Sequence, residues 1–172
     1  MASSPDPDHV YSLAYEELRR LAATILFGEP HASISPTTLV HEAWLKLRRS
    51  PNLTANSELH FKRIAARAMR QVLVDAARRR RAEKRGAGLT LVAFDEALDA
   101  PVSTDDQVLA LDDALSELGR QFPRQAEMIE GRYFGGLSVA ETAELLGISE
   151  ATLSRDWRAA RAWLAAELSR AG

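Results

Sequence analysis

Basic side chains are concentrated in one stretch of the chain. Between Lys62 and Arg85 there are ten lysines and arginines against two acids, which gives this stretch a charge of +8. A cluster of this kind provides the electrostatic surface that a polyanion such as nucleic acid requires. Taken alone, the cluster is equally compatible with a solvated helix end, because cations also stabilise a helix C-terminus. A nuclear localisation signal is a further formal alternative.

Two short helices that meet at a glycine are predicted for residues 136–164. Ser138 and Glu141 form a capping-box pattern, Gly147 ends the first helix, and Ser149 is placed to cap the second. This combination predicts a helix-turn-helix, although glycine-broken helical hairpins also occur in bundles. The second helix would meet a major groove through its outer residues, which are Ala151, Thr152, Ser154, Arg155 and Arg158. Because arginine can bind guanine with two hydrogen bonds, DNA contact is favoured over a solvated helix face.

An acidic block follows the basic one and cancels it. Residues 86–119 contain eight acids and no lysine or arginine, so the whole chain carries a net charge of only −2. Such a segment could fold back on the basic helix and compete with DNA, because a short linker keeps the local concentration high. The acids considered for this role are Asp95, Glu96, Asp99, Asp105 and Asp106. A solvated linker is the alternative interpretation.

The composition argues against several other classes of protein. The chain has no cysteine, and its four histidines show no metal-ligand spacing, so we expect no metal and no disulfide. We find no nucleophile with a base and no glycine-rich phosphate loop, so we expect neither a cofactor nor an enzyme. No apolar run approaches the roughly 20 residues of a membrane span, and no signal-peptide pattern is present. We therefore expect a cytoplasmic protein without membrane insertion.

The elements that must position these residues are helices. Apolar residues at helical spacing predict helices at 8–27, 37–49, 58–82, 106–119 and 123–133, followed by the helix-turn-helix. Proline, asparagine and serine predict a loop at 50–57, and glycine, proline and acids predict a linker near 87–105. The expected fold is therefore all-α, with two small helical domains at 8–86 and 106–170 joined by a flexible acidic linker at 87–105.

The order of these elements resembles the bacterial sigma-70 family, in its extracytoplasmic-function (ECF) type. The helix TTLVHEAWLKL, a polar loop, a basic helix, a linker and a helix-turn-helix follow one another from Tyr11 to Leu168. The resemblance implies a factor that binds core RNA polymerase, directs it to promoters and assists melting of the −10 element. The two domains would be sigma region 2 and sigma region 4. The rival is a helix-turn-helix transcriptional regulator with an N-terminal sensing domain, and association with core polymerase distinguishes the two.

The segment LVHEAWLKL is similar to region 2.2, which docks on the β′ clamp helices of the polymerase. The resemblance implies a docking role for four residues: Leu39, His41, Glu42 and Lys46. Of these, Leu39 lies on the core face of the helix with Ala43 and Leu47, which leaves the other three as contacts.

The approach to this docking helix departs from the family pattern. ECF factors usually carry an acidic cluster there, whereas this chain has Thr37 and Thr38 and no acid between Glu29 and Glu42. The threonines either cap the helix after Pro36 or receive phosphate from a Ser/Thr kinase, which would supply the missing negative charge.

The resemblance also assigns promoter contacts. The loop at 50–57 corresponds to the segment that receives a flipped base of the −10 element, with Asn52 and Asn56 as readers, and His60 stands where many relatives carry tryptophan. The implied −10 contacts are Lys62, Arg63, Arg67, Arg70, Arg78, Arg79, Arg80 and Arg81. The helix-turn-helix would be region 4.2, which reads the −35 element, and Ser154 stands where relatives often have lysine. The implied partners are promoter DNA, the β′ clamp helices, the β flap and, as a regulator, an anti-sigma factor or a kinase.

Overall fold

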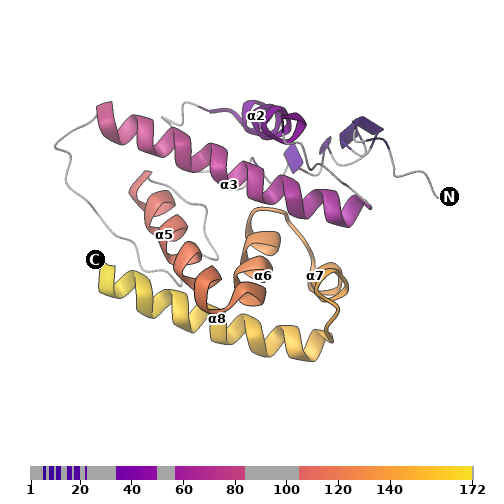
Figure 1. The fold of residues 1–172 in the computed structure, drawn as a ribbon, viewed down its shortest axis with the longest axis vertical. Helices are drawn as coiled ribbons and strands as arrows, with labels where there is room; N and C mark the ends of the chain where they lie inside the picture. Colours follow the sequence, from indigo (N-terminus) through magenta and orange to yellow (C-terminus); the bar gives the residue numbers. More distant parts are fainter. Residues whose placement is uncertain are drawn as a thin grey trace.

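The structure is a computed structural model of the chain. It describes residues 34–49, 57–83 and 105–171, together with the N-terminal positions 6, 8, 9, 11, 12, 15, 16, 18, 19 and 22. After the N-terminal positions, the described residues form helices α2 (Pro36–Arg48), α3 (Glu58–Glu83), α5 (Asp105–Gln121), α6 (Pro123–Tyr133), α7 (Val139–Leu146) and α8 (Glu150–Ala171) (Figure 1). No strand occurs among the described residues, and the all-α prediction is confirmed.

The N-terminal half is built on α3, the long basic helix. Helix α2 packs on α3 and buries Leu39, Ala43 and Leu47, as their helical spacing predicts. Aromatic rings extend this contact: Trp44 stacks on Tyr11 with ring centres 4.5 Å apart and lies 5.9 Å from Phe61. Burial raises the pKa of Tyr11 to about 12, and the neighbouring Tyr15 adds to the effect.

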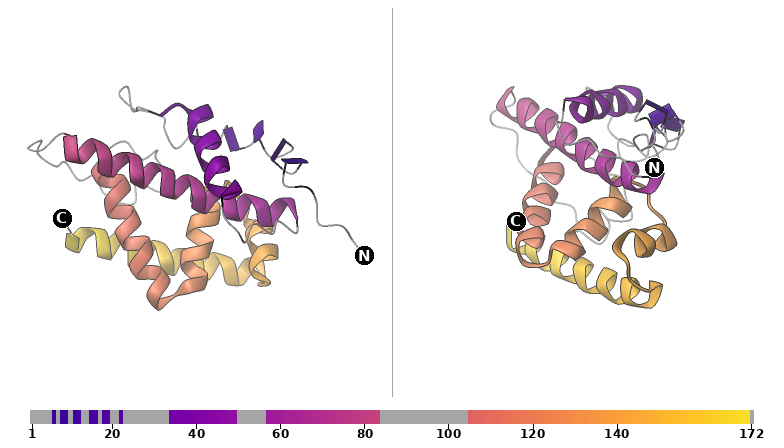
Figure 2. Two further views of the ribbon diagram at one scale, coloured as in Figure 1. Left: turned by 45° about the horizontal axis from the view of Figure 1, so that its top comes forward. Right: turned by 45° about the vertical axis from the view of Figure 1, so that its right-hand side comes forward.

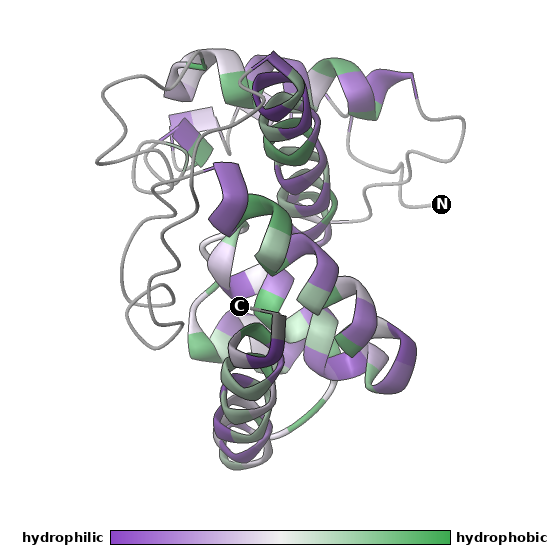
Figure 3. Ribbon diagram, turned by 90° about the vertical axis from the view of Figure 1, so that its left-hand side faces the viewer, coloured by the Kyte–Doolittle hydropathy of each residue, from purple (hydrophilic) through white to green (hydrophobic). Residues whose placement is uncertain are grey.

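The C-terminal helices form a second layer against the opposite side of α3. Helices α5, α6 and α7 contact α3 on one side and α8 on the other, and Figures 1 and 2 show them lying between the two long helices. Helices in both halves are amphipathic (Figure 3), so each has an apolar side to contribute. The result is one continuous core that includes Met69 of α3, Leu115 of α5, Ile129 of α6 and Leu164 of α8.

The helix-turn-helix is fixed by local interactions that the sequence predicts. The Ser138 Oγ accepts the Glu141 N–H at 3.1 Å and the Glu141 carboxylate accepts the Ser138 N–H at 2.8 Å, which completes the capping box. Gly147 ends α7 in the left-handed conformation, with φ of 65°. The Ser149 Oγ then accepts the Thr152 N–H at 3.1 Å near the start of α8.

Other boundaries differ from prediction or lie outside the described residues. Helix α5 continues to Gln121 rather than ending at Gly119, where an added Cβ would make an ordinary 3.6 Å contact with Ala126. The predicted linker up to residue 104 and the loop positions 50–56 are not described, and the division into two domains stays a prediction. None of the helices in the described part of the chain is long and apolar enough to span a membrane.

Candidate promoter and polymerase interfaces

The outer face of α8 presents a group of polar and basic side chains to solvent. Ala151, Ser154, Arg155 and Arg158 are exposed, and Thr152 is half-buried. The Arg155 guanidinium donates to the Thr152 hydroxyl at 3.3 Å, and Arg158 Nε donates to the Ser154 carbonyl at 3.3 Å. Neither arginine forms an ion pair with another described residue. The face that the resemblance assigns to the −35 element is therefore accessible, with both cations available for phosphate or base edges.

The inner face of α8 is anchored to the rest of the C-terminal layer. Leu153, Ala160 and Leu164 are at most 2% exposed. The Arg132 guanidinium of α6 lies 4.2 Å from the centre of the Trp157 ring, and its burial lowers the pKa of Arg132. Sequence reasoning missed this pair, because no local pattern shows that two residues 25 positions apart in the sequence will meet.

The basic helix α3 has its central arginine turned toward the C-terminal layer. Arg70 Nε donates to Asp112 Oδ1 of α5 at 2.8 Å, and Arg70 Nη1 donates to Glu130 Oε2 of α6 at 2.8 Å. All three side chains are at least four-fifths buried. Arg70 is thus a structural link between the two halves in this conformation, a role that its basic sequence neighbourhood does not indicate.

The start of α3 is connected to the C-terminal layer in the same way. The Lys62 side chain is only 6% exposed, and its Nζ lies 3.4 Å from both Glu58 Oε1 and Glu141 Oε1. Arg63 pairs with Glu127 of α6. The backbone N–H of Ser138 holds the pKa of Glu141 below its ordinary value; burial opposes this shift, and Lys62 supports it.

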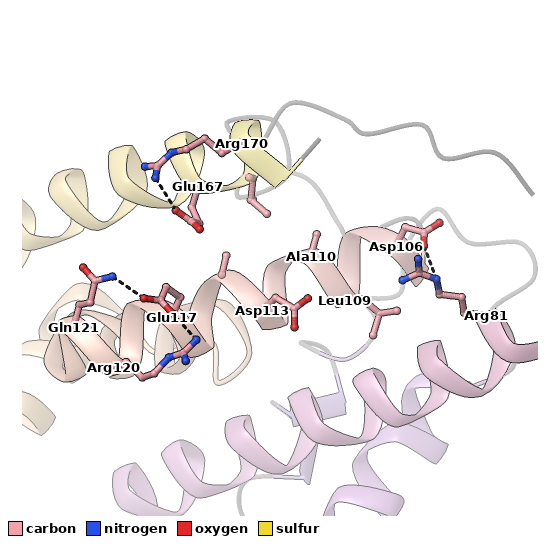
Figure 4. Close-up of a pocket in the computed structure, with 12 residues that line it drawn as sticks. Arg81, Asp106, Leu109, Ala110, Asp113, Glu117, Arg120, Gln121, Glu167 and Arg170 are labelled. Carbon is pink, nitrogen blue, oxygen red and sulfur yellow. Dashed lines mark hydrogen bonds and ion pairs between the residues drawn. The ribbon is translucent and has the colours of Figure 1, made fainter.

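At the end of α3, one arginine is hydrogen-bonded to an aspartate and several others are exposed. Arg80 Nε donates to Asp105 Oδ1 at 2.8 Å, and the Arg80 side chain is 21% exposed. Arg78 and Arg81 are about 60% exposed and make only distant contacts, 3.8 Å to Asp112 and 3.7 Å to Asp106. Figure 4 shows the Arg81 contact at the rim of a groove between α5 and the end of α8.

The eight basic candidates for the −10 element therefore fall into two groups. Lys62, Arg63, Arg70 and Arg80 face carboxylates, mostly of the C-terminal layer, whereas Arg67, Arg78, Arg79 and Arg81 are exposed. Neither Arg67 nor Arg79 is ion-paired within the described residues. His60 is half-buried, and its backbone N–H donates to Ser57 Oγ at 3.1 Å. Asn52 and Asn56 lie outside the described residues.

The docking candidates on α2 divide between core and surface. Leu39 is completely buried, so it positions the helix and offers no surface for direct contact. His41 and Glu42 are exposed, and Lys46 Nζ pairs with Asp75 of α3 at 2.7 Å. Leu45 is 44% exposed and lies on the same face as His41 and Glu42, three to four positions along the helix. The signal that could have found Leu45 is its spacing, since it lies three and four positions after Glu42 and His41 in the sequence.

The start of α2 corrects the expectation that threonine caps it. Ser35 is the N-cap residue, and its Oγ accepts the Thr38 N–H at 3.1 Å. The Thr38 hydroxyl is exposed and lies 2.9 Å from the Ser35 Oγ, whereas Thr37 is half-buried. No acid lies in the first turn of α2, as the sequence indicates.

Comparison with known protein families covers nearly the entire chain. The model of the ECF sigma factor family matches residues 4–170. No curated protein and no solved structure matches the chain significantly. The match includes α2, α3 and the helix-turn-helix, which are three of the elements whose order resembles the family. The chain belongs to the ECF sigma factor family, whose members function in transcription initiation with core RNA polymerase and promoter DNA.

Proposed function

We propose that this sigma factor reads its promoter in two parts, with α8 at the −35 element and α3 at the −10 element. The observation that carries the proposal is the exposed outer face of α8, where Arg155 and Arg158 have no ion-pair partner among the described residues. The N-terminal part of the second helix in a helix-turn-helix is the part that reaches base edges. The capping box and the Arg132–Trp157 contact hold this helix in a fixed orientation.

The −10 half of the proposal rests on α3 and the loop before it. The exposed arginines Arg67, Arg78, Arg79 and Arg81 would contact phosphates, and Lys62, Arg63, Arg70 and Arg80 would join them after leaving their carboxylates. Asn52 and Asn56 would read an unstacked base, and His60 would lie against the melted strand. Two domains, at 8–86 and 106–170 with a linker at 87–105, allow both elements to be reached at once.

Docking on the polymerase would use the exposed face of α2. His41, Glu42 and Leu45 offer an imidazole, a carboxylate and an apolar side chain to the β′ clamp helices, and Lys46 borders this surface. The C-terminal layer would bind the β flap. We further propose that phosphorylation of Thr37 or Thr38 strengthens docking, because it places negative charge at the N-terminus of a helix that has no acid in its first turn. A Ser/Thr kinase would then regulate the protein by this phosphorylation, or an anti-sigma factor would regulate it by binding to it.

Run-off transcription tests the proposed function. The purified chain is added to core RNA polymerase with fragments of the host genome as templates, and the transcripts are sequenced at their 5′ ends. We expect discrete start sites that appear only when both proteins are present. Binding to DNA without any chain-dependent transcript, even from the Thr37→Glu/Thr38→Glu variant, would instead indicate a helix-turn-helix regulator.

The phosphorylation proposal has its own measurement. We expect Thr37→Glu/Thr38→Glu to bind core polymerase more tightly than the unmodified chain, and Thr37→Ala/Thr38→Ala to lose activity in cells. If the alanine variant transcribes normally under every condition that activates the unaltered protein, neither threonine is a control point.

A further inference from the structure

We propose that the C-terminal helices cover the −10 helix in the free protein, so that the chain is closed until it binds polymerase. This inference rests on the proposed role of α3 at the −10 element. The cover consists of ion pairs that join α3 to α5, α6 and α7, which we call the latch: Lys62–Glu141, Arg63–Glu127, Arg70–Asp112, Arg70–Glu130 and Arg80–Asp105.

The latch residues on α3 lie on the side of the helix that faces the C-terminal layer. Arg63, Ala66 and Arg70 follow one another at three- and four-residue spacing, which places them on one helical stripe. Ala66 is completely buried, and a Cβ added at Gly135 in the turn after α6 would lie 3.1 Å from the Ala66 Cβ. The close backbone approach of this turn seals the stripe from solvent between its two arginines.

The carboxylates of the latch occupy the positions that DNA phosphates would need. Arg70 donates from Nε to Asp112 and from Nη1 to Glu130, so two edges of its guanidinium are already hydrogen-bonded to carboxylates. Binding of phosphate to Arg70 therefore requires both carboxylates to leave first. Because the three side chains are four-fifths or more buried, solvent and salt screen their attraction much less than that of a surface pair.

The origin of these acids revises the fold-back hypothesis drawn from the sequence. Asp105 and Asp106 contact Arg80 and Arg81 as that hypothesis expects, and Asp95, Glu96 and Asp99 lie outside the described residues. Asp105, Asp106 and Asp112 belong to the acidic block and lie on α5, whereas the other latch acids, Glu127, Glu130 and Glu141, come from α6 and α7. The cover is therefore the folded C-terminal layer itself, including the helix-turn-helix.

The two promoter-reading faces differ in accessibility as a result. The outer face of α8 points to solvent while half of the basic candidates on α3 face carboxylates. In the closed form the chain can present its −35 half but only part of its −10 half. The apparent affinity for a −10 strand falls when only a small fraction of the molecules is open and able to bind it. The free protein therefore binds −10 strands weakly, and a partner that separates α3 from α5, α6 and α7 restores the affinity.

The test removes latch acids and leaves the proposed DNA contacts intact. Asp112→Asn/Glu130→Gln removes both charges that pair with Arg70 and leaves only its hydrogen bonds to neutral groups, which include the Asp112 carbonyl and the Ser116 Oγ. Asp113→Asn/Glu144→Gln is the matched control, because Asp113 and Glu144 are exposed acids on α5 and α7 without ion pairs to described residues. Both variants add the same charge to the chain. The probe is a fluorescently labelled single DNA strand of random sequence, titrated without polymerase. We expect the latch variant to bind it about tenfold more tightly than the control, a difference of about 1.4 kcal/mol.

A distance measurement in the full chain accompanies the titration. The chain has no cysteine, so Gln71→Cys on α3 and Ala166→Cys on α8, both at exposed positions, carry the two dyes. We expect energy transfer to fall in the latch variant and, in the otherwise unaltered chain, when core polymerase is added. If circular dichroism shows that the latch variant has lost helix, Asp105→Asn/Glu127→Gln replaces it, because these acids are more exposed.

The outcomes separate the latch from the proposed function. The latch is overturned if the latch variant and the control bind the DNA strand equally well, and if energy transfer changes neither in these variants nor when polymerase is added. That result would leave promoter-dependent transcription untouched. Failure of run-off transcription with competent core, from the Thr37→Glu/Thr38→Glu variant as well, overturns the proposed function regardless of energy transfer.

Discussion

At the scale of single residues, the accessible arginines of α8 carry the proposed specificity. Arg155 and Arg158 are exposed and contribute only weak contacts within their own helix. We expect Arg155→Ala and Arg158→Ala each to weaken transcription from the chain's own promoter by about tenfold, since one bidentate base contact is worth about 1 to 3 kcal/mol. The free energy of unfolding should stay unchanged. The matched control is Arg170→Ala, an exposed arginine at the far end of the same helix; an equal loss in this control would contradict base reading.

The lowered pKa of Glu141 leads to a prediction of how the stability of the protein changes with pH. Its pKa is lowered first by the backbone N–H of Ser138 and also by Lys62. A carboxyl whose pKa is lower in the folded state stabilises the protein above its ordinary pKa of about 4.3, and this contribution is lost as the pH falls through the folded value. We expect Glu141→Gln to be less stable than the unaltered chain at pH 7 and to lose less stability between about pH 5 and pH 3. Parallel urea midpoints across that range in both proteins would contradict this assignment.

At the scale of elements, the turn before α8 depends on one glycine. Gly147 has φ of 65°, and a Cβ added there meets nothing within 4 Å. Backbone strain is therefore the only expected effect of Gly147→Ala, which should lower the free energy of unfolding by about 1 to 2 kcal/mol. Gly147→Asn should cost less, because asparagine tolerates the left-handed region. Equal urea midpoints for all three proteins would show that the turn tolerates the strain.

The proposed docking surface of α2 gives a second prediction for an element. Leu45 is 44% exposed beside His41 and Glu42. We expect Leu45→Asp to weaken binding of core polymerase by about tenfold, the effect of losing an apolar interface residue worth more than about 1 kcal/mol. Leu45→Met should bind normally, since it preserves the apolar contact. Unaltered polymerase affinity of Leu45→Asp, measured by fluorescence anisotropy of the labelled chain, would place docking on another face.

Local elements could be predicted from the sequence because their determinants lie within a few residues. Ser138, Glu141 and Gly147 each act on neighbouring backbone, and the structure has them as predicted. The helical spacing of Leu39, Ala43 and Leu47 predicts which side of α2 is buried, and the structure confirms this prediction. The predicted cap of α2 was wrong, because the Oγ of Ser35, and not a threonine hydroxyl, accepts the backbone N–H of Thr38.

At the scale of the whole molecule, the packing of the two halves was not predictable from local pattern. The sequence shows a basic block and an acidic block, but not that Arg70 would meet Asp112 and Glu130 from two different helices. Long basic side chains in a run are interpreted as solvated or DNA-binding, whereas Lys62 is buried between Glu58 and Glu141. Such pairings depend on how α3 lies against α5, α6 and α7, which only the tertiary structure defines.

The central claim is that α3 and α8 contact separate elements of one promoter within the polymerase complex. It is tested most directly by placing a photo-crosslinking amino acid at Arg67 or at Arg155 and mapping the crosslinks in an initiation complex that yields a transcript. Both positions are exposed, on α3 and α8 respectively. We expect crosslinks from position 67 in the −10 element and from position 155 in the −35 element upstream of the same start site. Crosslinks from both positions within one element, or none from position 67 in a transcribing complex, would contradict it.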